Sequence, residues 1–171
     1  DGQYTCCFDF DQQPSLPPVP SQPPSPPSQP PYPPGAAPAP PPPPSFSQIS
    51  AGGEHTCAVL DGVGHIECWG QDEDGQSTPP PGVAYSQVSA GDSHTCALRS
   101  DNGYAECWGD EDDKSTPPSN VSYSHIAAGE DLTCALRSDN GHAECWGDFD
   151  DEYVPPPGVA YLHISVGGDH V

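Results

Sequence analysis

The sequence has no methionine and only three cationic side chains, Arg99, Lys114 and Arg137. Set against 25 acidic residues, these give a formal net charge of -22. Three cations cannot make the array of phosphate contacts that nucleic-acid binding requires, and an anionic membrane surface is disfavoured for the same reason. We therefore expect no nucleic-acid partner, and we expect the excess acid to attract divalent cations.

Long hydrophobic runs are also missing. No apolar stretch approaches the roughly 20 residues of a membrane span, so we expect no direct membrane insertion. No signal peptide is visible at Asp1, which is expected of a mature product or a fragment. Eight cysteines, by contrast, indicate an oxidising and hence extracellular compartment.

Proline and charge are unevenly placed. Of the 26 prolines, 18 lie between Pro14 and Pro44, and from Gln12 to Ser45 the only ionisable side chain is Tyr32. Every cation and nearly every acid lies downstream of this stretch. Two physically different segments are therefore joined in one chain.

The downstream segment repeats itself. Residues 47–70, 86–109 and 124–147 align, and Cys57, Cys96 and Cys134 are 39 and 38 residues apart. A fourth copy begins as LHISVGGDHV at 162–171, and DGQYTCCFD at 1–9 matches the second half of a repeat. The predicted organisation is a partial repeat at 1–11, an arm at 12–45, repeats at 46–85, 86–123 and 124–161, and a partial repeat at 162–171.

Each repeat predicts three short strands. In the first copy these are Ile49 to Ala51, about His55 to Leu60, and His65 to Trp69. A turn of sequence DGVG or SDNG separates the last two strands, and its residues tolerate positive φ. The fold class is therefore predicted to be all-β, with three-stranded units.

The cysteine positions fit a hairpin. If Cys57 faces Cys68, the turn is centred between Gly62 and Val63, and the other two copies centre in the same way. Cysteines directly opposite on a hairpin have the short Cβ separation that a disulfide needs. The predicted bonds, each worth about 2–3 kcal/mol, are Cys57–Cys68, Cys96–Cys107 and Cys134–Cys145.

Cys6 and Cys7 are left over by this pairing. Cys7 occupies the third-strand position of its partial repeat, but the second-strand partner is absent. One hypothesis is a bond from Cys7 or Cys6 to a neighbouring chain or to residues outside this segment, and the alternative is a vicinal Cys6–Cys7 bond.

Alternation along the strands assigns two faces. Cys57, Val59, Ile66 and Cys68 share an apolar side that should pack on a neighbouring repeat. The other side, with Thr56, Ala58, Glu67 and Trp69, should suit stacking.

The recurring histidines and glutamates are expected to be structural. His55, His94 and His170 share one position, where the third copy has Leu132; His65 and His142 share another, where the second copy has Tyr104. A ligand would not be replaced by leucine, so packing is the better interpretation. Glu106 and Glu144 recur without a partner base, and an ion pair with Arg99 or Arg137 is expected instead.

The recurring Ala-Gly, His-Thr-Cys and Cys-Trp-Gly motifs, in register over about 46–171, resemble the repeat of the regulator of chromosome condensation family. The cysteine-bearing form is similar to repeats in crinkly-type plant receptor kinases. The resemblance implies β-propeller blades or a related open β-superhelix, here an open array or partial propeller. It does not by itself imply a function, because the family includes exchange factors, receptor ectodomains and inhibitors.

The arm at 12–45 predicts polyproline II, and Pro14 to Pro44 would then extend over roughly 95 Å. Its Ser-Pro-Pro and Tyr-Pro-Pro pieces are similar to hydroxyproline-rich, extensin-like glycoproteins of plant and green-algal walls. That resemblance implies a hydroxylated, arabinosylated rod; the alternative is a flexible linker. The implied positions are Pro23, Pro24, Pro26, Pro27, Pro30, Pro31, Pro33, Pro34, Pro40, Pro41, Pro42, Pro43 and Pro44.

The acidic loops and one sequon are further candidate sites. Clustered carboxylates at Asp110, Asp112 and Asp113 suit calcium, although they lack EF-hand spacing, and a solvated acidic loop is the alternative. Asn120 begins the one N-glycosylation sequon in the sequence.

These observations lead to two hypotheses of function, and neither is an enzyme. We expect no cofactor; glycans are expected as a covalent modification, and calcium is a further candidate. The first is a structural subunit of an extracellular filament, sheath, cell wall or surface appendage. It would assemble head to tail with itself, and also contact other wall or appendage glycoproteins, by completing β-repeats between chains. The second is a ligand-binding, receptor- or lectin-like propeller ectodomain on a proline-rich stalk.

Overall fold

The computed structural model describes residues 40–110, 116–148, 155–168 and 171. The chain divides into two compact units, 1–40 and 41–171, and the description below concerns the second. The predictions for the partial repeat at 1–11, and for the arm as far as residue 39, lie outside the described residues.

The described part of the chain forms strands and no helices, and therefore contains no helix that could cross a membrane. Its strands are β1 (Phe46–Ala51), β2 (His55–Leu60), β3 (Ile66–Gly70), β4 (Tyr85–Ala90), β5 (His94–Arg99), β6 (Ala105–Gly109), β7 (Tyr123–Ala128), β8 (Leu132–Arg137) and β9 (Ala143–Gly147).

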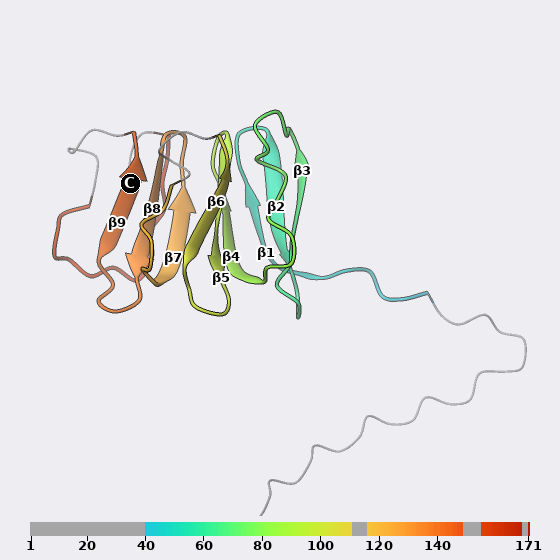
Figure 1. The fold of residues 1–171 in the computed structure, drawn as a ribbon, viewed down its shortest axis with the longest axis horizontal. Helices are drawn as coiled ribbons and strands as arrows, with labels where there is room; N and C mark the ends of the chain where they lie inside the picture. The colour runs from blue at the N-terminus through green and yellow to red at the C-terminus, as the bar shows by residue number, and fades with distance from the viewer. Residues whose placement is uncertain (1–39, 111–115, 149–154, 169–170) are drawn as a thin grey trace, which may run out of the picture. The chain divides into compact units, whose positions relative to one another are not determined.

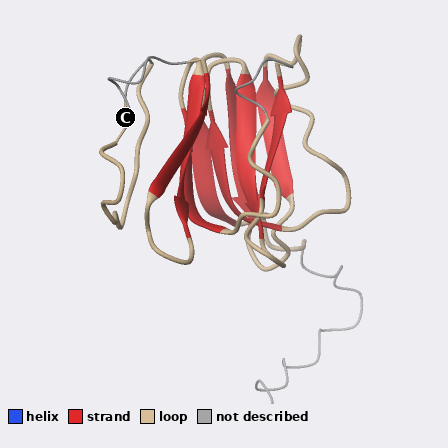
Figure 2. Ribbon diagram, turned by 60° about the vertical axis from the view of Figure 1, so that its left-hand side comes forward, coloured by secondary structure: helices blue, strands red, loops and turns tan. Residues whose placement is uncertain are grey.

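The strands build three separate sheets of three antiparallel strands, each in chain order. We call β1–β3 blade 1, β4–β6 blade 2 and β7–β9 blade 3. Figures 1 and 2 show the blades side by side in a row. The prediction of an all-β, open array of blade-like repeats is confirmed.

The second and third strands of each blade form the predicted hairpin. Cys57 pairs directly with Cys68, and the equivalent cysteines pair in the other two blades. The turns contain glycines with positive φ at Gly62, Gly103 and Gly141, a conformation that residues with a Cβ adopt rarely. The turn chemistry and the hairpin register therefore agree.

The first strand of each blade is longer than predicted. β1 begins at Phe46 rather than Ile49, since its pairing with β2 continues past a register shift between Phe46 and Gln48. The Ser47 hydroxyl donates to the Val59 carbonyl oxygen at 3.3 Å across this irregularity. A bulge interrupts the two-residue alternation, so the pattern of side chains does not reveal the start of the strand.

A backbone bond ties the start of each repeat to the turn of the repeat before it. The amide of Tyr85 donates to the Gly64 carbonyl oxygen at 2.7 Å, and that of Tyr123 to Gly103 at 2.8 Å. Tyr161 donates to Gly141 at 2.9 Å in the same way. Residues after 160 therefore enter against blade 3 as β4 enters against blade 1.

The core lies between the blades. We call the side of a blade that meets the following repeat its front face, and the opposite side its rear face. The front face of blade 1 carries Cys57, Val59 and Ile66, which cluster with Val88 and Trp108 on the rear face of blade 2. The same layers meet between blades 2 and 3, so the predicted packing of one repeat's cysteine side on its neighbour is confirmed.

Candidate interaction surface

The contact between blades is the recurring feature from which a binding surface can be derived. Its centre is apolar: Val88 is 1% exposed and Trp108 is 9% exposed beneath the front face of blade 1. Tyr85 lies beside Trp108, with ring centroids 6.0 Å apart. Burial and a hydrogen bond to Glu106 raise the pKa of Tyr85, which keeps its phenol protonated.

A histidine and a threonine bridge neighbouring blades at the edge of this core. His55 Nε2 lies 2.7 Å from Thr95 Oγ1, and His94 Nε2 lies 2.7 Å from Thr133 Oγ1. The Thr95 hydroxyl donates to the Gln76 carbonyl oxygen at 2.9 Å, so its oxygen accepts the proton on His55 Nε2. His55 and His94 are therefore structural, as predicted, and they act between blades. His65 is exposed, and His170 lies outside the described residues.

The neutral form of His55 suits this position. The residue is 3% exposed, and Nδ1 has no hydrogen-bond partner within the described part of the chain. Burial lowers the pKa of His55, although Asp92 and Asp72 partly oppose this shift. A second proton, on Nδ1, would bury a charge and find no acceptor among the described residues, so protonation would destabilise the folded state.

A glutamine supplies a second contact between blades that sequence reasoning missed. The Gln48 amide donates to the Val88 carbonyl oxygen at 3.1 Å and accepts from the Val88 amide at 2.8 Å. Gln87 bonds to the backbone of Ile126 in the same way. The only available signal was the recurrence of glutamine at 48 and 87, because the partner is backbone and leaves no trace in the sequence.

A serine adds a third contact. The amide of Ala90 donates to Ser50 Oγ at 3.0 Å, and the amide of Ala128 donates to Ser89 Oγ at 2.9 Å. The histidine, glutamine and serine of one blade thus make the same polar contacts to the next blade at both interfaces.

The contact between blade 3 and residues 160–168 uses different side chains. His125 stands at the glutamine position, and its ring lies 5.2 Å from that of His163, edge to face. Burial and the neighbouring His163 both lower the pKa of His125. Leu132 replaces the bridging histidine and is completely buried.

No described residue covers the rear face of blade 1, which is therefore open within the described part of the chain. Ile49 is 64% exposed and Trp69 is 47% exposed, whereas their counterparts in blade 2 are the buried Val88 and Trp108. Phe46 is also exposed and packs near Trp69, with ring centroids 6.4 Å apart. Phe46 stands where blades 2 and 3 have tyrosine, so the open face is more apolar than the buried ones.

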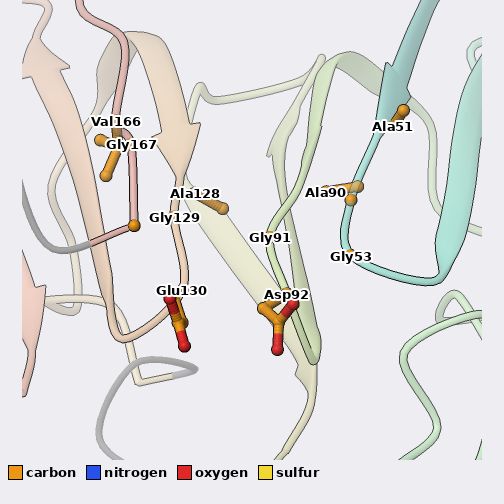
Figure 3. Close-up of a pocket in the computed structure, with 12 residues that line it drawn as sticks. Ala51, Gly53, Ala90, Gly91, Asp92, Ala128, Gly129, Glu130, Val166 and Gly167 are labelled. Atoms are coloured by element: carbon orange, nitrogen blue, oxygen red, sulfur yellow. The ribbon is translucent and has the colours of Figure 1, made fainter.

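A pocket of about 240 Å³ lies where the first strands end, and Figure 3 shows its lining. Glycine is required in this wall because a Cβ at Gly91 would overlap the Gly129 carbonyl oxygen, and one at Gly52 would overlap Gly91. The carboxylates of Asp92 and Glu130 point the same way from neighbouring corners (Figure 3). No group of three metal-ligating side chains occurs among the residues that the structure describes.

The remaining predicted sites are placed as follows. The structure forms all three predicted disulfides, Cys57–Cys68, Cys96–Cys107 and Cys134–Cys145. Cys6 and Cys7, the prolines up to Pro34, and Asp112 and Asp113 lie outside the described residues. Pro40–Pro44 are exposed and belong to no strand. Asp110 is partly buried and accepts from the Ser93 hydroxyl at 3.4 Å.

The predicted ion pairs are present. Arg137 Nη1 lies 3.3 Å from Glu144 Oε2, and Arg99 Nη1 lies 3.7 Å from Glu106 Oε2. Each arginine also bonds an aspartate two residues further on, at 3.1 Å for Arg99 and Asp101. The aspartates of these pairs, at the hairpin turns, are exposed, whereas the arginines and glutamates are partly buried.

The fold and its interface define a class of protein built from stacked, disulfide-braced propeller blades. Residues 46–76 and 85–114 match the family model described as the regulator of chromosome condensation (RCC1) repeat. The resemblance predicted from the sequence motifs is therefore confirmed for these two repeats. No curated protein sequence matches the chain.

Solved structures with the same architecture include plant receptor-kinase ectodomains. The CRINKLY WD40 ectodomain of the Arabidopsis thaliana receptor kinase ACR4 is 26% identical, with a TM-score of 0.61, over 70% of this chain and 43% of that one. The entire ectodomain of the Physcomitrella patens receptor kinase CR4 is 25% identical, with a TM-score of 0.62, over 71% and 33%.

Yeast RCC1 (Prp20), solved bound to Kap60, shares the fold alone. It is 17% identical, with a TM-score of 0.56, over 72% of this chain and 40% of its own. The chain spans less than half the length of each of these proteins.

Proposed function

We propose that this chain is a non-catalytic, extracellular interaction module that binds another protein through the rear face of blade 1. The proposal is supported mainly by one contact surface that is buried twice between blades and is exposed a third time, on blade 1, among the described residues. Ile49 and Trp69 are exposed at positions that are buried in blades 2 and 3. An exposed apolar patch surrounded by polar residues is typical of a protein-binding surface.

The extracellular setting is supported by two independent features. The three disulfides among the described residues suit an oxidising compartment. The similar plant structures are ectodomains of receptor kinases.

A non-catalytic role is supported by the use of the recurring polar side chains. His55 and His94 bridge blades, and Glu106 and Glu144 bond tyrosine and arginine within blades. These groups serve the fold, so we propose neither an active site nor a resident cofactor; calcium at Asp110, Asp112 and Asp113 stays a prediction.

The direct test uses a charge on the open face. Ile49→Asp in the full secreted chain should lower binding to an extracellular extract of the source organism by at least about tenfold, because a buried carboxylate is costly. The matched control is Val63→Asp, at an exposed position in a hairpin turn, which should bind as the unaltered chain does. Equal binding by all three proteins would rule out this face.

Two forms of the module remain to be distinguished. The similarity to receptor ectodomains favours a ligand-binding domain, with residues 12–45 as its stalk. The exposed apolar face of blade 1 favours a subunit of an extracellular filament, sheath or wall, with the same residues as a glycan-bearing arm. Electron microscopy of native material should show discrete particles for the first form and ordered polymers for the second.

Mass analysis of the arm distinguishes the same two forms by chemistry. Under the filament form, peptides from residues 13–45 should carry hydroxyproline and pentose in excess of the bare mass. An unmodified mass over these residues would remove the glycan-bearing rod from the proposal.

A further inference from the structure

We infer that the partner of the open rear face of blade 1 is a second copy of this chain, which lays its residues 162–168 along β1. This inference rests on the proposed function and names the partner for the same surface. It is carried by the exposed side of residues 160–168, which presents the groups that blades use to hold the next blade.

Residues 160–168 already occupy the place of a following blade's first strand. Tyr161 donates to Gly141, and Glu130 donates to the Gly168 carbonyl oxygen at 3.3 Å. Ile164 and Val166 are partly buried against blade 3, at the positions of Val88 and Ala90. One side of this segment is therefore engaged as the rear side of a fourth blade.

The other side of the segment is exposed. Ser165 stands at the position of Ser50, whose hydroxyl accepts the Ala90 amide, and His163 stands at the position of Gln48. Both are exposed, and Leu162 beside them is 90% exposed. The segment therefore offers a serine hydroxyl and a histidine ring where the chain elsewhere uses a serine and a glutamine.

Blade 1 offers the complementary groups. Ala51 and Ile49 stand at the positions of Ala90 and Val88, and both are exposed. In blade 2 the backbone amides at these positions donate to the serine and glutamine side chains of blade 1. Thr56 stands at the position of the buried Thr95 and is partly exposed. A second copy placed by the same step that relates one blade to the next would bring Ser165 to the Ala51 amide.

This arrangement is continuous with the interfaces inside the molecule. Equivalent residues join blade 1 to blade 2 and blade 2 to blade 3. Each copy would contribute residues 162–168 to one contact and the rear face of blade 1 to another. The contact is therefore heterologous, and it can be repeated from copy to copy.

A cross-link tests the contact directly. Within the chain, Ser50 Oγ lies 3.0 Å from the Ala90 amide, so cysteines at the two equivalent positions should be close enough for a disulfide. Full-length Ser165→Cys and Ala51→Cys variants are mixed under mild oxidation. The expected product is a covalent dimer whose peptide map joins residues 51 and 165, absent from either variant alone.

Two outcomes overturn the inference. One is a mixture of folded variants that yields no linked 51–165 peptide. The other is a Ser165→Cys/Ala51→Cys double variant that cross-links only within its own chain, because the face would then be covered without a second copy.

Sedimentation separates the inference from the proposed function. Ile49→Asp should weaken self-association at least about tenfold, and Val63→Asp should leave it unchanged. If Ile49→Asp lowers extract binding while the chain neither cross-links nor self-associates, the module binds a different protein and only the second copy is excluded. If Ile49→Asp changes neither measurement, both proposals fail.

Discussion

At the scale of single residues, the histidine–threonine bridge has a natural replacement within the same chain. Leu132 and Val171 stand where the preceding repeats have His94 and Thr133, so both members of the pair change together. His55→Leu should lower the free energy of unfolding by about 1–3 kcal/mol, since it removes the donor to a buried hydroxyl. Adding Thr95→Val should recover part of that loss.

Chemical denaturation of the unaltered protein, of each single variant (His55→Leu and Thr95→Val) and of the double variant gives a double-mutant cycle. We expect a coupling energy of about 1 kcal/mol. Additive effects of the two substitutions would show that the bridge contributes little. The Gln76 carbonyl oxygen remains bonded to the Trp108 indole in the double variant, so no new unsatisfied group complicates the comparison.

The lowered pKa of His55 predicts a dependence of stability on pH. The unfolded chain takes up a proton on this ring at a higher pH than the folded chain does. Stability is therefore fully present above the unfolded pKa of about 6.5 and is lost as the pH falls. Denaturation at about pH 8 and about pH 5 should show this loss, and the loss should be smaller in His55→Leu; an equal loss would assign it to other groups.

Asn120 is placed as a glycan acceptor. It is exposed in a turn with φ +62°, at the repeat position of Gly82 and Gly158, where a Cβ would meet nothing within 4 Å. Ser122 replaces the alanine of the other copies and completes the sequon. We expect a secreted chain from eukaryotic cells to carry an N-glycan that peptide N-glycosidase removes.

Asn120→Gly is the matched control for this site, because glycine is what the other two turns use. It should abolish the glycan without affecting folding. The reciprocal change, Gly82→Asn with Ala84→Ser, should create a glycan on the preceding turn. A chain that leaves Asn120 unmodified in the same cells would contradict the assignment.

Some residue roles followed from the sequence and others could not. Replacement of a recurring histidine by Leu132 indicated a packing role for the histidines, and the structure agrees. The two hydrogen bonds from Gln48 to the backbone of Val88 could not be predicted, because a backbone partner leaves no pattern in the sequence. The open rear face was likewise hidden, because Ile49 and the buried Val88 have almost the same side chain and differ only in what covers them.

At the scale of elements, the disulfide braces each hairpin on the side that meets the next blade. Removing Cys96 and Cys107 together, as a pair of serines, should cost about 2–5 kcal/mol. The unfolded chain gains freedom, and two hydroxyls enter the layer that contacts blade 3. Thermal unfolding of the variant against the unaltered protein measures this, and an unchanged midpoint would contradict it.

Hairpins were the most predictable elements because two independent signals coincide in each of them. The cysteine spacing and the Asp-Asn-Gly sequence both predict the same centre for the hairpin turn. The observed pairing of Cys96 with Cys107 agrees with that centre. The first strand had only one signal, alternation, and the register shift near Ser86 breaks it. Local chemistry therefore revealed the turns but not the bulges.

At the scale of the whole molecule, the net charge of -22 opposes association of like copies. If the copies meet through the apolar rear face of blade 1, added salt should screen the repulsion and strengthen the contact. We expect the sedimentation coefficient to rise from about 20 mM to about 300 mM sodium chloride. The Ile49→Asp variant should show a much smaller rise, and dissociation on adding salt would instead indicate attraction between charges.

The glycine corners have a consequence for how such a chain changes over generations. At Gly91 and Gly129 the backbones of successive repeats approach closely, and the main contacts between blades in the described part of the chain join neighbouring repeats. An unequal crossover that duplicates or deletes one unit of 38 or 39 residues would rebuild the same contact at the new junction. Recombination can therefore change the number of repeats without losing the contact between them. Substitution of the corner glycines, by contrast, would make a Cβ overlap the backbone of the next repeat.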